Sequence, residues 1–310
     1  MMKILVGLDF EDASEHGTAT PEAVRILQQL RFPDAGIEVA HAVSPFITPA
    51  SQLEALLLTA GEDLASAYAT ERATAKYLVE SAAGKFESGA DGALGARGIV
   101  LSGNAAVALM DRADQTQVDL IAVNGSPRRS LLDVLLTANV ARDIVVGAQQ
   151  SVLIARPGCD TARPIRAVLA TDHSLYANRC VELLGRFAPA GIGHLTVLTA
   201  YPNDQIQRLR TLIGEMAVDP AEAVRDHLCA RNALVTDILS HHLAPGTTFT
   251  SRVTPEPVQQ AIAQTMAEAE ADLLILGAKG HGFVERLLLG SVSFRHAVMN
   301  VPYSVLILRA

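Results

Sequence analysis

Short apolar runs alternate along the chain with longer segments in which apolar residues recur every three or four positions. Short continuous runs are typical of strands buried on both faces, and the longer segments are typical of amphipathic helices. In the first half the predicted strands are Ile4–Leu8, Glu38–Val43, Gly98–Leu101, Asp119–Val123 and Ser151–Ala155. In the second half they are Ile165–Thr171, His194–Ala200, Thr248–Val253, Asp272–Leu276 and Ser304–Leu308.

Helical patterns fill the spaces between these strands. In the second half they cover Leu175–Phe187, Asp204–His242 with a break near Asp219–Pro220, Val258–Ala271 and Phe294–Asn300. In the first half, the Ala-, Glu- and Leu-rich segment Thr48–Phe86 predicts a covering helix rather than a partner-binding arm. Strands that alternate with helices imply right-handed crossovers and a parallel sheet. The pattern therefore predicts an α/β fold of two tandem doubly wound, five-stranded, Rossmann-like domains.

The two halves repeat each other. Ser151–Pro157 reads SVLIARP and Ser304–Ala310 reads SVLILRA, so the two runs agree at Ser, Val, Leu, Ile and Arg. Asp119 and Asp272, each before an apolar strand, are 153 residues apart, whereas Asp9 and Asp172 are 163 apart. The first half therefore has ten more residues than the second, and they fall where helices and loops are expected.

The repeat predicts two domains, residues 1–157 and 164–310. Pro157, Gly158 and Pro164 mark the stretch Arg156–Pro164 as the linker between them. Pairing of the two final strands would join the halves into a pseudo-dimer within one chain. The sequence leaves open whether whole chains form a further homodimer.

Composition narrows the class of protein. Of the 310 residues, 49% are hydrophobic but only 4% are aromatic, and none is Trp, so the core must be aliphatic. The net charge of −8 disfavours a duplex-binding protein, which needs a basic face. The shortage of rings argues against a stacking platform for nucleic acid. We therefore expect no nucleic-acid partner.

Cysteine usage and hydropathy indicate a cytoplasmic protein. Cys159, Cys180 and Cys229 are too few and too scattered for a disulfide framework or a zinc site. The apolar run at the N-terminus ends at Asp9, too early for a signal peptide. The longest charge-free stretch, Phe187–Asn203, contains prolines and glycines and predicts no membrane helix. We expect neither a membrane partner nor a metal site.

The segment after the fourth strand of the second half carries the candidate chemistry. It has the pattern G-x2-G-x9-G-S, with glycines at Gly277, Gly280 and Gly290. Glycine lets the backbone approach a ligand closely, and the N–H groups at a helix start attract anions. Ser291, Val292 and Ser293 open the last helix, and Lys279 adds a cation. Since ligands of such sheets bind at the carboxyl ends of strands, the pattern predicts a polyphosphate site.

These glycines could also belong to an ordinary turn or to a different nucleotide-binding loop. A short G-x-x-G alone is more often a turn than a ligand site. The chain has no G-x4-G-K-[ST] loop, and Glu285 stands where G-x-G-x-x-G would need its last glycine. The extended pattern favours a ligand site because both of its parts occur in the right structural context.

With its Asp-terminated first strand, D-L-[LI] fourth strand and the spacing from Gly277 to Ser293, the chain resembles a tandem universal stress protein over nearly its whole length. The resemblance implies an adenine nucleotide alpha hydrolase-like fold and ATP as ligand, with Mg²⁺ held through the phosphates. It implies phosphate and ribose contacts from Gly277, Lys279, Gly280, Gly290, Ser291, Val292 and Ser293. It also implies adenosine contacts from Ala170, Thr171 and Asp172, and a base pocket lined by Ala200 and Leu276.

The two halves differ at these positions. Asp172 can accept hydrogen bonds from a ribose or an exocyclic amine, although it could instead cap the helix that starts near Ser174. At the 153-residue offset, the glycines and hydroxyls of the second half are replaced by Asn124, Pro127, Thr137, Ala138 and Val140. A shift by one residue to use Gly125 places Arg128 where the second glycine belongs. We therefore expect the first half to bind ATP weakly or not at all.

Several further side chains have weaker signals. His241–His242 and Arg128–Arg129 are read as solvated, His281 could lie near phosphate or be a turn residue, and the directions of Arg286 and Arg295 cannot be read. The favoured function is an ATP-binding, nucleotide-sensing stress-response regulator without a catalytic residue set. The alternatives are a slow ATPase or related nucleotide-dependent enzyme, and an interaction module that binds no nucleotide. The signal, the protein partner and the choice among ATP, ADP and AMP stay open.

Overall fold

The computed structural model describes residues 1–8, 20–44, 50–87, 95–125, 140–158, 162–201, 206, 219–279, 290–299 and 301–310. Its strands are β1 (Lys3–Gly7), β2 (Gly36–Val43), β3 (Arg97–Ser102), β4 (Leu120–Asn124), β5 (Ser151–Ala155), β6 (Ile165–Ala170), β7 (Ile192–Ala200), β8 (Thr248–Thr254), β9 (Leu273–Gly277) and β10 (Ser304–Leu308). All ten predicted strands are present, with ends within two residues of those predicted.

These strands form one sheet in the order β3-β2-β1-β4-β5-β10-β9-β6-β7-β8. Neighbouring strands within each half are parallel. Each half therefore has the doubly wound order 3-2-1-4-5, and the predicted fold class is confirmed.

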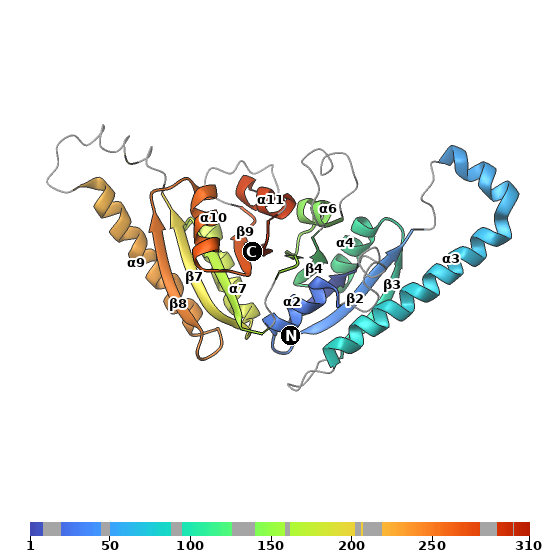
Figure 1. Ribbon diagram of the computed structural model, residues 1–310, viewed down its shortest axis with the longest axis horizontal. Coiled ribbons are helices and arrows are strands. Elements are labelled where there is room, and N and C mark those ends of the chain that lie inside the picture. The colour runs from blue at the N-terminus through green and yellow to red at the C-terminus, as the bar shows by residue number, and fades with distance from the viewer. Residues whose placement is uncertain are drawn as a thin grey trace.

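The two halves join through their last strands. β5 and β10 pair antiparallel, with Leu306 opposite Leu153. This is the predicted contact between the halves, and it makes one chain a pseudo-dimer around the centre of the molecule (Figure 1). Because both strands are paired on both sides, neither leaves an open edge at the junction.

The helices are α2 (Glu22–Leu30), α3 (Ala50–Glu87), α4 (Ala105–Thr116), α6 (Val140–Gly147), α7 (Leu175–Phe187), α9 (Pro220–Ser240), α10 (Val258–Glu268) and α11 (Ser291–Val298). One apolar cluster contains residues of α2, α3, α7 and α9, and the other contains residues of α4, α6, α10 and α11. The second set forms a row across the upper middle of Figure 1. The sheet is thus covered on both faces by an aliphatic core, as its composition predicts.

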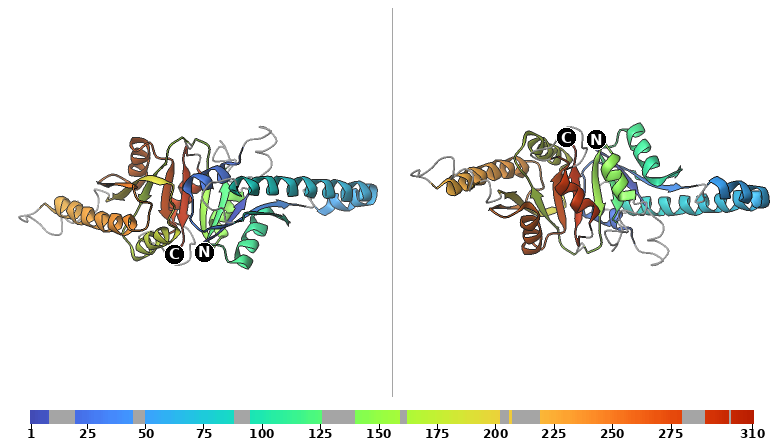
Figure 2. Two further views of the ribbon diagram at one scale, coloured as in Figure 1. Left: turned by 90° about the horizontal axis from the view of Figure 1, so that it is seen from below. Right: turned by 90° about the horizontal axis from the view of Figure 1, so that it is seen from above.

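Two helices reach away from the junction. α3, in the predicted covering segment, and α9, which begins at the predicted break, extend toward opposite ends of the molecule (Figure 2). The predicted range Phe294–Asn300 was wrong for the last helix, because α11 begins at Ser291 with Gly290 as its N-cap. This start is the one that the glycine–serine pattern favoured, and it brings the first turn of the helix close to β9.

A second contact between the halves involves the turn after α7. The N–H of Gly191 donates to the carbonyl of Leu30 at 2.8 Å, and the N–H of Ala190 donates to that of Arg31 at 2.9 Å. A Cβ on Gly191 would lie 1.6 Å from the carbonyl oxygen of Gln29, so this close approach requires glycine. The halves are therefore held together by backbone contacts away from the central strands as well.

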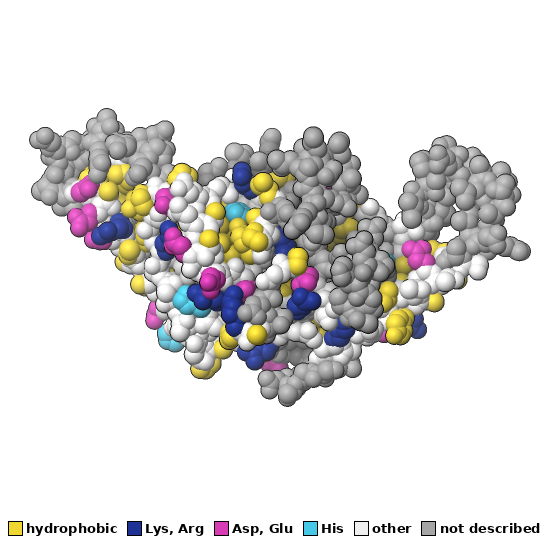
Figure 3. Space-filling view, in the orientation of Figure 1, with side chains coloured by type: hydrophobic (Ala, Val, Ile, Leu, Met, Phe, Trp, Pro, Cys, Tyr) yellow, Lys and Arg dark blue, Asp and Glu magenta, His cyan; other side chains and the backbone are white. Residues whose placement is uncertain are grey.

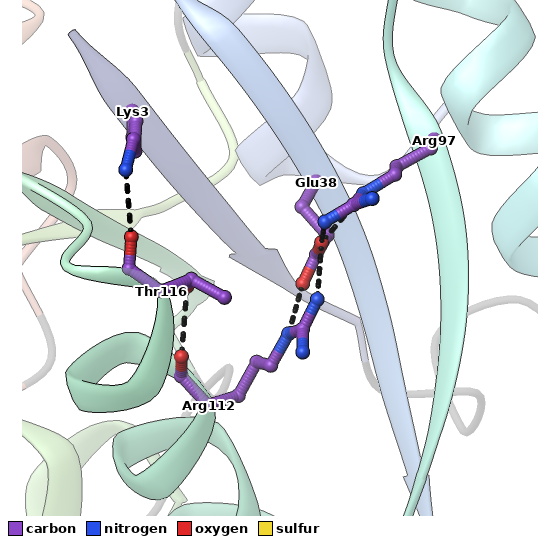
Figure 4. Close-up of polar contacts among 5 residues, drawn as sticks. All are labelled: Lys3, Glu38, Arg97, Arg112 and Thr116. Carbon is purple, nitrogen blue, oxygen red and sulfur yellow. Dashed lines mark hydrogen bonds and ion pairs between the residues drawn. The ribbon is translucent and has the colours of Figure 1, made fainter.

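The N-terminal half contains an ionic trio around a buried carboxylate (Figure 4). Glu38, 8% exposed, accepts hydrogen bonds from Arg112 at 2.6 and 2.8 Å and from Arg97 at 2.7 Å. The hydrogen bond from Arg112 is the main cause that lowers the pKa of Glu38. The trio connects β2, β3 and α4 near the amino ends of the strands, opposite the edge where ligands of such sheets bind.

Candidate functional site

The topological switch point of the C-terminal half lies between β6 and β9. From β6 the chain proceeds to β7 on one side, whereas β9 lies on the other. Ala170 pairs with Leu276, so Thr171, just after β6, and Gly277, the last residue of β9, lie at the same level of the sheet. The structure thus brings together two segments that are about a hundred residues apart in the sequence.

A tight turn follows β6. The N–H of Thr171 donates to Leu198 at 3.0 Å, and the Thr171 hydroxyl accepts from the N–H of His173 at 3.1 Å. The Asp172 carboxylate accepts from the N–H of Ser174 at 3.0 Å. Ser174, rather than Asp172, is the N-cap of α7. The alternative helix-capping interpretation of Asp172 is therefore replaced by a role in shaping the turn before that cap.

The two ends of the glycine–serine pattern meet. The N–H of Gly290 donates to the carbonyl of Ala278 at 2.6 Å, and the hydroxyl of Ser293 donates to that of Gly277 at 2.7 Å. Ser293 is 4% exposed, so its hydroxyl fastens the first turn of α11 to the end of β9. Ser291 is exposed at the helix start, and no side chain of the described residues caps this helix. N–H groups at such a helix start are suited to an anion.

Gly277 lies against α7. A Cβ at this position would be 3.3 Å from Cys180 Sγ and 3.5 Å from Tyr176 Cε1, so a larger side chain would extend toward that helix. The ammonium group of Lys279 lies 5.6 Å from the centroid of the Tyr176 ring, a cation–π distance. Burial raises the pKa of the Cys180 thiol to about 12, so this cysteine stays protonated and unreactive at neutral pH.

The apolar candidates share one face of the sheet. Leu276 belongs to the cluster of the α10–α11 face, and Ala170, Ala200 and Val292 pack against it. Leu276 is 4% exposed, which makes it part of this core. Gly280, together with His281 and Arg286, lies outside the described residues.

Other predicted candidates lie away from the switch point. Arg295 is in the last turn of α11, at the opposite end from Gly290. The ring nitrogens of His241 and His242 lie 2.7 and 2.8 Å from backbone carbonyls of the preceding turn. Within the residues that the structure describes, no group of three or more His, Cys, Asp or Glu side chains could hold a metal ion.

In the N-terminal half, the position equivalent to Gly277 has a different role. Asn124 ends β4 as Gly277 ends β9, and its side-chain oxygen accepts from the N–H of Ala23 at 2.8 Å. α2 begins there after Pro21, which supplies no side-chain cap. The residue that replaces the glycine therefore caps a helix. Asp9, Pro127, Arg128, Thr137 and Ala138 lie outside the described residues, and Val140 begins α6.

Sequence reasoning missed a buried polar group beside the site. The His173 ring nitrogen Nε2 lies 3.0 Å from both Asn232 Oδ1 and Thr199 Oγ1. Burial is the main cause that lowers the pKa of His173, which favours the neutral imidazole. The group connects the turn after β6 with β7 and α9. No spacing signal could have identified it, because its members come from three elements.

Arg156, the first residue of the predicted linker, has a role that the sequence reasoning did not predict. Its side chain is 6% exposed and donates hydrogen bonds to carbonyls at the end of α11, in the other half. The signal was present in the sequence, because the repeated runs SVLIARP and SVLILRA both keep this arginine.

The comparisons with known proteins agree with this architecture. A sequence model described as the universal stress protein family matches residues 1–156 and 166–309. A universal stress protein from Archaeoglobus fulgidus is similar in structure, with a TM-score of 0.58 at 17% identity, covering 99% of this chain and 98% of that one. A functionally unknown protein from Pseudomonas aeruginosa has a TM-score of 0.55 at 12% identity, covering 99% and 92%.

The search of curated proteins found no match.

Within the described part of the chain, no helix is both long and apolar enough to cross a bilayer. On the face shown in Figure 3, basic and acidic side chains are interspersed.

Proposed function

Because the chain belongs to the universal stress protein family, we propose that it is an ATP-binding stress-response protein with one competent nucleotide site, between β6 and β9. Residues 164–310 would form the binding domain, and residues 1–157 a related domain that has lost the site. The observation that carries the proposal is the junction of Gly277 with the first turn of α11. A cytoplasmic location stays a prediction from the sequence.

The polyphosphate would lie at the start of α11. The backbone there has no side-chain cap among the described residues, and the helix dipole favours negative charge. Gly277 and Gly290 have no Cβ, so a ligand can approach the backbone closely at both positions. The side chains of Lys279 and Ser291, which lie close to these glycines in the sequence, are exposed. Mg²⁺ would be held through the phosphates, which supply the oxygen ligands that it prefers.

The nucleoside would lie at the ends of β6 and β7. Thr171 and Asp172 supply polar atoms at the end of β6, and Ala170 and Ala200 supply small apolar surface. Asp172 would accept from the ribose or the exocyclic amine. The base would therefore contact aliphatic residues rather than stack between rings.

Calorimetric titration with Mg-ATP tests the proposal. We expect one site per chain, and loss of binding in the double variant Gly290→Val, Ser291→Ala. Asn124→Gly, at the equivalent end of β4, is the matched control and should bind as the wild type does. Two equal sites, or equal binding by the double variant, would contradict the proposal. Mass spectrometry of nucleotide released from purified protein would distinguish ATP from ADP and AMP, and a phosphate-release assay would detect a slow ATPase.

A further inference from the structure

Two arginines related by the internal repeat cross the junction between the halves. Arg156 follows β5, and Arg309 follows β10 at an offset of 153 residues. The N–H of Arg156 donates to the hydroxyl of Ser304 at 3.1 Å, and the N–H of Arg309 donates to that of Ser151 at 3.2 Å. Both serines are 1% exposed. The two halves thus exchange equivalent hydrogen bonds around the central strand pair.

The guanidinium groups of the two arginines also donate hydrogen bonds across the junction. Arg156 donates to the carbonyls of Ala297 at 2.8 Å and Met299 at 2.9 Å, at the end of α11. Arg309 donates to the carbonyl of Gln150 at 3.0 Å and to that of Val145, at the end of α6. Each arginine therefore satisfies the carbonyls at the carboxyl end of the last helix of the opposite half, where a cation is favourable.

For α11 this contact occurs on the same helix as the proposed phosphate site. α11 has eight residues, so its two ends are about 12 Å apart. Ser293 fastens its first turn to β9, and Arg156 fastens its last turn to the N-terminal half. Burial lowers the pKa of Arg156 to about 10, so the side chain is charged at neutral pH.

A glycine in the N-terminal half makes room for this side chain. A Cβ on Gly125 would lie 3.0 Å from Cγ of Arg156 and 3.2 Å from the carbonyl oxygen of Ala155. Gly125 directly follows β4, where a nucleotide-binding half would carry its motif. In this half, the glycine after the fourth strand therefore provides the space that the Arg156 side chain occupies.

We propose that Arg156 is a positioning residue for the nucleotide site, through which the N-terminal half supports ATP binding by the C-terminal half. The inference rests on the proposed function. Arg156 fixes the position of α11 against β9 and adds positive charge to the helix end opposite the phosphates. Arg309 provides the same support to α6, in the half that lacks the glycine–serine pattern.

The repeat supplies the matched control for a test. Arg156→Met and Arg309→Met each remove one cross-junction cap, and both should lower the Tm. We expect Arg156→Met to raise the Kd for Mg-ATP about tenfold, and Arg309→Met to change it less than about twofold. Amide exchange in α11 should become faster in Arg156→Met alone. Arg156→Lys, which keeps the charge, should recover part of the affinity.

The outcomes separate this inference from the proposed function. A wild-type chain that binds no ATP contradicts the proposed function. If the wild-type chain binds ATP and the two methionine variants show equal changes in Kd, the proposed role of Arg156 is overturned, while the proposed function is not. If Arg156→Met does not fold, Arg156→Gln provides the second test, because it removes the charge and shortens the side chain that reaches the carbonyls of Ala297 and Met299 while keeping a polar group. An unchanged Kd in a folded Arg156→Gln protein also overturns the role.

Discussion

The switch point between β1 and β4 and the one between β6 and β9 have the same strand order, but the fourth strand ends in a different residue at each. At the end of β4, the side chain of Asn124 reaches α2 and caps it. At the end of β9, Gly277 has no side chain and lies against Cys180 and Tyr176 of α7, which is capped by its own Ser174. The fold therefore determines where a nucleotide could bind, and the residue at the end of the fourth strand helps to determine whether the backbone there is accessible.

The largest expected effect comes from giving the second switch point the residue of the first. In Gly277→Asn, the new Cβ would lie 3.3 Å from Cys180 Sγ, and the amide beyond it would crowd the contact between β9 and α7. We expect the Kd for Mg-ATP to rise about 100-fold, equal to about 2.7 kcal/mol, as titration calorimetry would measure. Gly277→Ala should have a smaller effect of the same sign. An unchanged Kd in Gly277→Asn would show that the comparison of the two switch points is wrong.

The second effect concerns an ionic group that distinguishes the halves. In the sheet register, Thr196 of β7 and Thr250 of β8 occupy the positions of Glu38 and Arg97, and their two hydroxyl oxygens lie 2.9 Å apart, so the second half has no ion pair at this place among its described residues. Glu38→Gln removes the acceptor charge from Arg112 and Arg97, and we expect a loss of about 2 kcal/mol in the free energy of unfolding at pH 7. Urea unfolding measures this loss.

The pH dependence of this group has a definite sign. Because the pKa of Glu38 is lowered in the folded chain, its stabilisation is present above the unfolded pKa and is lost as the pH falls through the folded value. The difference between wild type and Glu38→Gln should therefore shrink below about pH 4. Glu268→Gln, which breaks an exposed ion pair with Arg252 in the other half, should cost less than about 1 kcal/mol. Equal losses of unfolding free energy in Glu38→Gln and Glu268→Gln would mean that the ionic trio does not distinguish the two halves energetically.

The third effect is a pH dependence located on α11. Burial lowers the pKa of His296 from 6.5 to about 4. Between these values the unfolded chain binds more protons, so stability falls as the pH falls from 7 to 5, by about 1–2 kcal/mol for this group. His296→Gln should remove that part of the pH dependence in chemical denaturation. Tyr303→Phe, which removes the hydrogen bond to His296 but keeps the imidazole, should retain it.

The smallest expected effect tests the cap in the N-terminal half. Asn124→Ala removes the acceptor for the N–H of Ala23, and loss of such a cap costs about 1 kcal/mol. The free energy of unfolding should fall by this amount, while the Kd for Mg-ATP should be unchanged. A change in nucleotide affinity would mean that the first switch point takes part in binding.

Most of the fold could be predicted because the strands are continuous apolar runs and occur twice. A strand such as Ser151–Ala155 is recognisable alone, and its copy at Ser304–Leu308 confirms the interpretation. The start of α11 was harder, since Gly290, Ser291 and Ser293 are weak helix formers. The position of the Gly290 cap and of the first helical turn depends on hydrogen bonds to Ala278 and Gly277, more than ten residues earlier.

The candidate site could be predicted only in part. The spacing identified Gly277 and Gly290 as parts of one motif, because both lie in a single short stretch of the sequence. The direction of a side chain depends on neighbours brought by the fold, such as Tyr176 beneath Lys279. Arg156 had the context of a linker, next to Pro157 and Gly158, and its side chain donates hydrogen bonds to carbonyls of the other half of the chain, which sequence spacing does not reveal.

The antiparallel pairing of β5 with β10 within one polypeptide has a consequence for how the protein can change. In a symmetric dimer of identical chains, every substitution occurs in both subunits, so an asparagine at the end of the fourth strand would alter both switch points at once. Here the two subunit equivalents are encoded separately. One copy can exchange its glycine for a helix-capping asparagine while the other keeps the glycine, so the proposed stoichiometry of one nucleotide per pair of domains would be encoded in the sequence of a single chain.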